Sequence, residues 1–95
     1  MRDKPIRYSA HLEGRLALRQ IDRGLPAKVI REAQGEYLDT ETGYRIALAE
    51  VPYRKGRHLM MVAFDEVGEE ITAITIHPLE ERDVESKLKT GRWTA

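Results

Sequence analysis

The sequence predicts a single α+β domain with two N-terminal helices, a four-stranded antiparallel β-meander and a C-terminal helix. Apolar residues recur at helical spacing as far as about residue 34. From Gly35 onward the pattern changes to short apolar and β-branched runs separated by three turn-rich segments. The chain has 95 residues, enough for one hydrophobic core and too few for two, so residues 1–95 are treated as one domain.

The first helix is expected over Ala10–Gln20, with Ser9 as its N-cap and an end near residues 22–24. Two apolar ridges run along it, a broad one (Ala10, Gly14, Ala17, Leu18, Ile21) and a narrow one (Leu12, Leu16). Between these ridges lie His11, Arg15 and Arg19, each four residues from the last and therefore in one row. A second helix is expected from Pro26 to about residue 34, ended by Gly35.

Four strands and a last helix are expected in the remainder. Residues 37–38 and 44–51 flank the turn-rich segment 39–43, which predicts a hairpin. Residues 58–64 are nearly all apolar, as in a central strand covered on both faces, and lie between turns at 54–57 and 65–69. Residues 71–76 form the fourth strand, which Pro78 closes. A helix over 79–89 then ends at Gly91 and leaves Arg92 and Trp93 as a tail.

Composition excludes several classes of protein. There is no cysteine, so a disulfide scaffold, a thiolate zinc site and a cysteine nucleophile are excluded. The longest apolar run, residues 59–64, is too short to span a membrane, and no apolar segment of a secretory signal is visible, so we expect a cytoplasmic protein. The 16 basic and 16 acidic residues cancel, but residues 1–31 hold eight basic and only three acidic residues. Such polarity can present a basic face to an anion such as nucleic acid.

The candidate chemistry lies on the first helix and at the end of the fourth strand. His11 is an acid or base candidate because imidazole is a common proton donor and acceptor in catalysis, and the planar guanidinium groups of Arg15 and Arg19 suit phosphate oxygens. Thr75 and His77 are two residues apart and therefore share a strand face. If that strand lies beside the first helix, His11 and His77 could flank one phosphodiester as base and acid. Such a site needs no metal ion and no cofactor.

Other interpretations of these residues remain open. His11 is also explained as a polar residue near a helix start, and Arg15 and Arg19 as a solvated stripe that pairs with strand carboxylates. The basic turn of Arg54, Lys55 and Arg57, with His58 after it, could contact a nucleic-acid backbone or simply face water. Three histidines without a close pair do not favour a zinc site.

The segment Tyr8-Ser9-Ala10-His11-x-x-x-Arg15-Leu16-x-x-Arg19-x-Ile21, followed by Val29 and Ile30, resembles a small uncharacterised bacterial and archaeal domain family. Members begin with a strand, then Ser-x-His and two arginines four apart, and end in a meander whose last strand carries Thr-x-aromatic. The family is grouped with the RelE-like and barnase–EndoU–colicin RNase fold, which includes many toxins of toxin–antitoxin pairs. The resemblance covers residues 6–78 and implies that His11, Arg15, Arg19 and Thr75 form the site. It departs from the family at Gln20, where glycine is common, and at His77, which replaces the aromatic residue.

Two functions follow as hypotheses. The first is a metal-independent endoribonuclease toxin that acts on RNA, free or on the ribosome, and is neutralised by an antitoxin protein encoded nearby. In it His11 is an acid or base, His77 the acid, and Arg15 and Arg19 stabilise the phosphate. The alternative is a catalytically silent protein of the same fold that binds nucleic acid or a protein partner. Both need a basic face on the same scaffold.

Overall fold

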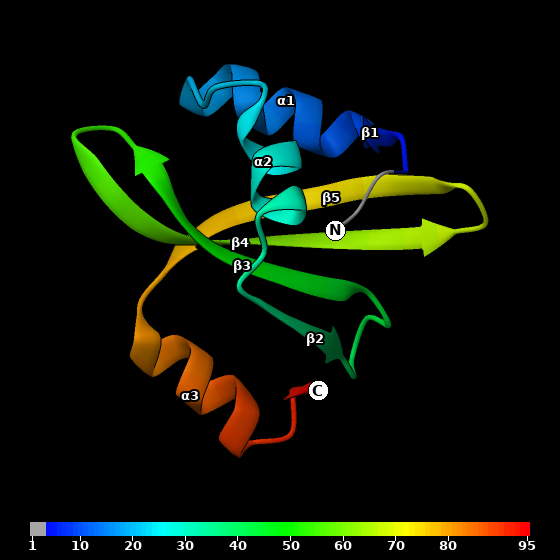
Figure 1. Cartoon of the computed structure of the whole chain (residues 1–95), viewed down its shortest axis with the longest axis vertical. Coiled ribbons are helices and arrows are strands. Elements are labelled where there is room, and N and C mark those ends of the chain that lie inside the picture. Colours follow the sequence, from blue (N-terminus) through cyan, green and yellow to red (C-terminus); the bar gives the residue numbers. More distant parts are fainter. Residues whose placement is uncertain (1–3) are drawn as a thin grey trace.

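The computed structural model describes residues 4–95, and within them the predicted α+β class is confirmed. Figure 1 shows three helices packed on one sheet. The elements in chain order are β1 (Ile6–Tyr8), α1 (Ala10–Arg19), α2 (Leu25–Arg31), β2 (Gly35–Asp39), β3 (Arg45–Tyr53), β4 (Gly56–Val67), β5 (Glu70–Leu79), α3 (Glu81–Lys89) and β6 (Trp93–Thr94).

The sheet has six strands in the order β1-β5-β4-β3-β2-β6, and it is mixed because β1 runs parallel to β5. The predicted antiparallel meander forms its centre, from β2 to β5. The prediction of a sheet with only four antiparallel strands is wrong, since β1 and β6 extend it at both ends. These strands have three and two residues, too few to show an alternating pattern in the sequence.

Helix α1 begins at Ala10 as predicted and ends at Arg19, one residue earlier than expected. The hydroxyl of Ser9 accepts a hydrogen bond from the amide of Leu12 at 3.1 Å, and Gln20 closes the helix in the left-handed conformation with φ of 54°. The narrow apolar ridge packs into the core, where Leu12 and Leu16 are buried. The other members of the broad ridge are exposed along α1, with Leu18 82% exposed, whereas Ile21, beyond the helix end, is buried in the core.

Helix α2 is shorter than predicted. It ends at Arg31, and Gly35, predicted to end the helix, is the first residue of β2. The reason is that sheet pairing has already begun at Gln34, whose amide donates to the carbonyl of Leu48 at 2.7 Å. Pro26 lies in the first turn of α2 as expected.

Strand β4 is the buried centre of the sheet and is longer than predicted. Gly56, Arg57 and residues 65–67, predicted as turn, belong to it, and the turns shrink to residues 54–55 and 68–69. Arg54 adopts a φ of 54°, which suits a two-residue hairpin turn. Coverage on both faces is confirmed, because residues 60–64 are all buried and belong alternately to two core clusters.

Strand β5 continues beyond its predicted end. It runs through Pro78 to Leu79, and α3 begins at Glu81 rather than at residue 79. The strand tolerates Pro78 because β1 pairs only with residues 71–73, so the outer edge of β5 has no partner strand there. Glu80 starts α3 in a capping box, in which its amide donates to Asp83 Oδ2 at 2.9 Å.

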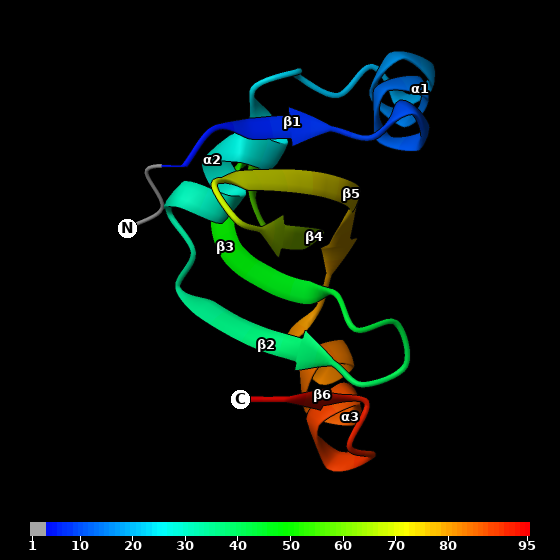
Figure 2. The same cartoon turned by 90° about the vertical axis from the view of Figure 1, so that its right-hand side faces the viewer.

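The two faces of the sheet carry different layers. Figure 2 shows α2 on one side of the sheet and α3 on the other, with α1 beside the β5 edge. The larger core lies under α1 and α2, and a smaller one on the opposite face includes Met61, Ala63 and Trp93, with Val84 of α3 packed against it. Arg92 and Trp93 are not the predicted tail, since Trp93 is buried in β6 and pairs with Asp39 of β2.

Candidate functional site

Thr75 and His77 lie on the sheet face of the smaller core, as predicted for residues two apart on one strand. Their partners across the sheet are Ala63 and Met61, which belong to that core. A bulge opposite Ala63 and Phe64 shifts the register just before Thr75, and such bulges commonly re-aim side chains beside functional sites. The result is a Thr75 hydroxyl only 3.4 Å from His77 Nε2.

Beyond the residues that pair with β1, helix α1 lies along the outer edge of β5. The amide of Ser9 donates to the carbonyl of Ala73 at 3.0 Å, and its hydroxyl donates to the carbonyl of Ile74 at 3.3 Å. The helix therefore begins beside Ile74 and runs along the part of β5 that carries Thr75 and His77 (Figures 1 and 2). The structure thus brings the predicted strand and helix together.

The surroundings of His77, including the α1 row, lower the pKa of its imidazole. Burial of the imidazole is the main reason why the pKa lies below its usual 6.5. The positive charges of Arg15, Arg19 and His11 lower it further, in that order. The row on α1 therefore acts electrostatically on the β5 histidine, and His77 is mainly neutral at pH 7.

Arg15 holds hydrogen-bond donors that nothing in the described chain satisfies. Its Nε and Nη1 atoms are buried and have no hydrogen-bond partner within residues 4–95. Neither Arg15 nor Arg19 forms an ion pair with a carboxylate in that same range, so pairing with strand carboxylates does not explain them. An unsatisfied buried donor costs about 1–3 kcal/mol, which an incoming anion would recover.

A cavity of about 340 Å³ opens beside Thr75 and His77. Its lining is mainly apolar, and its polar side chains include those of β5, of α3 and of Arg92, which directly precedes β6. Its lining residues are Asp39, Thr42, Tyr44, Ile46, Met61, Ala63, Ile74, Thr75, His77, Leu79, Lys87, Arg92 and Trp93. No residue of α1 lines the cavity, so the α1 row and the cavity meet only through Thr75 and His77.

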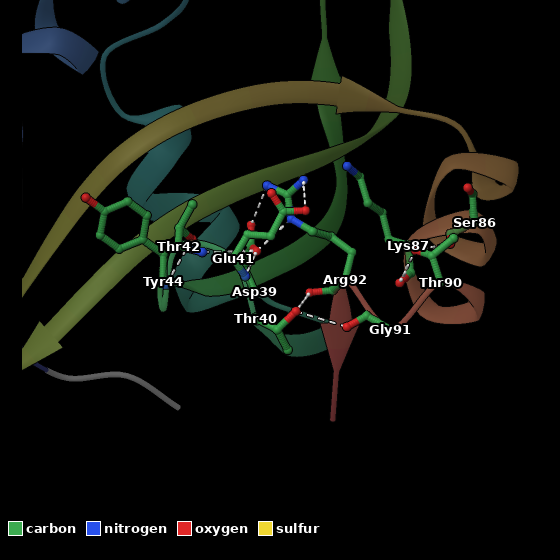
Figure 3. A network of polar contacts seen from close by, with 10 residues as sticks. All are labelled: Asp39, Thr40, Glu41, Thr42, Tyr44, Ser86, Lys87, Thr90, Gly91 and Arg92. Carbon is green, nitrogen blue, oxygen red and sulfur yellow. Dashed lines mark hydrogen bonds and ion pairs between the residues drawn. The ribbon is translucent and has the colours of Figure 1, made fainter.

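Arg92, which lines the cavity, belongs to a polar network with Asp39 and Glu41 (Figure 3). Its guanidinium donates to both carboxylate oxygens of Asp39, at 2.8 and 3.1 Å, and lies 3.1 Å from a Glu41 oxygen. Asp39 is 5% exposed and also accepts from the amides of Glu41 and Thr42. These contacts, above all the Arg92 hydrogen bond, hold the pKa of Asp39 below its usual 3.8.

The four predicted nucleic-acid-binding residues at the β3–β4 hairpin each have different surroundings. Arg54 shares a groove of about 270 Å³ with Arg19, so the turn adjoins the end of the α1 row. The Arg57 guanidinium donates to the carbonyl of Glu50 at 2.8 Å, and Lys55 is exposed at the tip. His58 packs edge-on against Tyr53 at 5.5 Å between ring centroids.

Sequence analysis missed Lys87, Arg92 and Asp39 as neighbours of the site. Lys87 and Arg92 lie in the C-terminal helix and in the segment taken as a tail, and neither forms a motif with His77. The one local signal was Asp39 before the Glu41–Gly43 turn, an arrangement typical of a carboxylate that accepts from turn amides.

Among residues 4–95, no three His, Asp or Glu side chains are grouped so that they could hold a metal ion. No helix in that range is long and apolar enough to cross a membrane. Comparison of the chain with protein-family models, with curated proteins and with solved structures found no match.

Proposed function

We propose that this protein is an endoribonuclease that cleaves RNA by attack of a ribose 2′-hydroxyl on the adjacent phosphodiester, without need of a metal ion. The observation that carries the proposal is the pair of unpartnered, buried Arg15 donors beside a largely neutral histidine. Cationic donors and a neutral imidazole are the groups that such a reaction requires.

The reaction balances without any further reactant. A base removes the 2′-hydroxyl proton while the 2′-oxygen forms a bond to phosphorus. The bond from phosphorus to the 5′-oxygen then breaks, and an acid gives that oxygen a proton. The products are a 2′,3′-cyclic phosphate and a 5′-hydroxyl; the base has then gained one proton and the acid has lost one, and exchange with water restores both.

His77 is assigned as the base because its lowered pKa keeps the imidazole neutral near pH 7. This reverses the acid role expected from the sequence. Thr75 Oγ1 lies 3.4 Å from Nε2, and in the tautomer in which Nε2–H donates to this hydroxyl oxygen, Nδ1 is free to accept the proton. His11 is exposed at the start of α1 and is assigned as the acid. Arg15 and Arg19 bind the phosphate oxygens and stabilise the charge that develops on them.

We infer a place in the RelE-like group from the resemblance of the sequence. Two helices precede an antiparallel meander and a short strand precedes the first helix, as the resemblance implies. On this basis the substrate is RNA, free or on the ribosome, and the cellular role is that of a toxin with an antitoxin encoded nearby. We further infer a cytoplasmic location.

A catalytically silent binding protein is the second candidate, and one observation favours it. The outward face of α1 exposes Leu18 beside Ala17 and Gly14, next to the basic row. Exposed apolar residues next to cations suit a protein partner. In that case Arg15 and Arg19 would bind the partner's acidic groups rather than a scissile phosphate.

The test is incubation of the purified protein with single-stranded RNA in excess chelator, with analysis of the product ends. His77→Ala and His11→Ala should each slow cleavage by about 10²–10⁴-fold, the usual worth of a general base or acid. Arg31→Ala on α2 is a control, since Arg31 is an exposed cation of the helix on the other face. Wild type and His77→Ala with equal residual cleavage would exclude the enzyme and leave the binding protein.

A further inference from the structure

The cavity beside His77 continues the proposed site across the sheet face. Thr75 and His77 belong to both, while Lys87 reaches the cavity from α3. Its volume of about 340 Å³ is near the lower end of the range of small-molecule pockets, about 300–1,000 Å³. One nucleoside fits such a space, and a folded partner does not.

The cavity lining suits a flat, largely apolar group. Met61, Ala63 and Ile46 form an apolar floor, and Tyr44 and Trp93 add aromatic surface. Trp93 is fixed in place, because it is 3% exposed and stacks on Tyr37 at 5.9 Å between ring centroids. Nucleobases bind to surfaces of this kind through stacking and apolar contact.

The cations at the rim differ in what they can still bind. Arg92 is saturated by Asp39 and Glu41. Lys87 forms no ion pair with any carboxylate of residues 4–95, and Figure 3 shows its side chain extending from α3 alongside the Arg92 guanidinium. Lys87 is therefore the rim cation that can meet an anion.

We propose that the cavity is a nucleoside subsite, in which one base of a single-stranded RNA lies on the Met61–Ala63 floor between a phosphate at Arg15 and His77 and a second phosphate at Lys87. This inference rests on the proposed function for its substrate class. It adds a specificity element that the catalytic groups do not supply, because they contact only phosphate and ribose.

Trp93 provides a direct measurement, since it is the only tryptophan of the chain and lines the cavity. The protein is titrated with uridine and adenosine 3′-monophosphates while its fluorescence is recorded. Inorganic phosphate and ribose 5-phosphate, which lack a base, serve as matched probes. Saturable change with the nucleotides and not with the matched probes is the expected result.

Two variants locate the binding. Lys87→Ala should weaken nucleotide binding about tenfold, as for loss of a hydrogen bond to a charged group, while Lys89→Ala, an exposed lysine on the same helix, should not. Ala63→Phe should fill the cavity and abolish the fluorescence change, with Val67→Phe at the exposed end of β4 as its control. If Ala63→Phe does not fold, the Lys87→Ala result decides.

The outcomes separate the two proposals. Nucleotide binding that depends on Lys87 in a protein that cleaves no RNA supports the subsite and overturns the nuclease. RNA cleavage without a saturable Trp93 signal, and with unchanged cleavage in Lys87→Ala, overturns the subsite alone. A base-free probe that changes the fluorescence as nucleotides do also overturns it.

Discussion

Arg92 lines the cavity and Arg15 acts from α1 on His77 of its lining, and the two arginines have opposite surroundings. The guanidinium of Arg92 meets two Asp39 oxygens and one Glu41 oxygen. The Nε and Nη1 atoms of Arg15 are buried and meet no acceptor within residues 4–95. The first arginine completes the fold, because it ties the C-terminal strand to β2.

The difference separates a structural charge from a functional one. A guanidinium with its acceptors in place has little left to offer a ligand. One with unpartnered donors carries a cost that a bound phosphate can remove. The lowered pKa of His77 belongs to the same contrast, since no carboxylate of residues 4–95 is among the charges that act on its imidazole.

The largest effect is expected for Arg15→Met, a substitution that keeps an apolar stem and removes the charge. RNA cleavage should fall by about 10²–10³-fold, as for loss of a group that stabilises developing charge. The free energy of unfolding should stay unchanged or rise, because no hydrogen bond within residues 4–95 is lost. The rate of RNA cleavage measures the first effect, and urea denaturation measures the second. A marked loss of stability would instead place Arg15 among the structural charges.

Asp39→Ala tests the structural side. It removes the acceptor of two Arg92 hydrogen bonds and two amide hydrogen bonds. The free energy of unfolding at pH 7 should fall by about 2–3 kcal/mol, measured by urea denaturation. Asp65→Ala, an exposed residue of β4, should change it by less than about 0.5 kcal/mol.

The same carboxylate predicts a pH dependence. The folded-state pKa of Asp39 lies below its usual 3.8, so the ionised form stabilises the fold. That contribution is fully present above the unfolded pKa and is lost as pH falls through the folded one. The difference in free energy of unfolding between wild type and Asp39→Asn should therefore become smaller below pH 4. A gap that stays constant down to pH 2 would contradict the Arg92 pairing.

The sequence predicts the elements whose pattern is long and local. Ser9 and the Leu12–Leu16 ridge define α1, and the apolar run at 59–64 defines the buried centre of β4. Its local patterns do not predict β1 and β6, which pair with β5 and β2, although the resemblance implies a strand before the first helix. The predicted end of α2 near residue 34 is wrong, because pairing with the sheet already begins at Gln34, before the glycine expected to stop the helix.

The site residues also fall into those that local spacing predicts and those that it does not. The i, i+4 spacing of His11, Arg15 and Arg19 predicts one row, and the two-residue spacing predicts that Thr75 and His77 share a face. Lys87 and the Asp39–Arg92 pair come from segments far apart in the chain, and no local pattern links them to His77. Only the β-sheet order and the packing of α3 bring them to the cavity.

A smaller effect concerns the titration of His77. Its pKa, measured by NMR of the imidazole protons, should lie below 6.5, and Arg15→Met should raise it toward that value because one positive charge is removed. Cleavage should increase with pH through the same midpoint, since the base must be neutral. Arg7→Ala on β1 is a control that leaves the pKa unchanged, as Arg7 is not among the charges that act on His77. An unchanged pKa of His77 in Arg15→Met would show that the charge of Arg15 does not act on His77.

The smallest effect is expected at the hairpin tip, where Lys55 is exposed and adjoins Arg54 beside the α1 row. If RNA extends from Arg19 across this turn, Lys55→Ala should weaken binding of an uncleavable DNA oligonucleotide without abolishing cleavage. The slope of log affinity against log salt should fall by about 0.7, the value for one phosphate contact on a single strand. Lys89→Ala on α3 is the matched control. An unchanged slope would end the RNA path at Arg19, and the hairpin would then belong with the solvated charges.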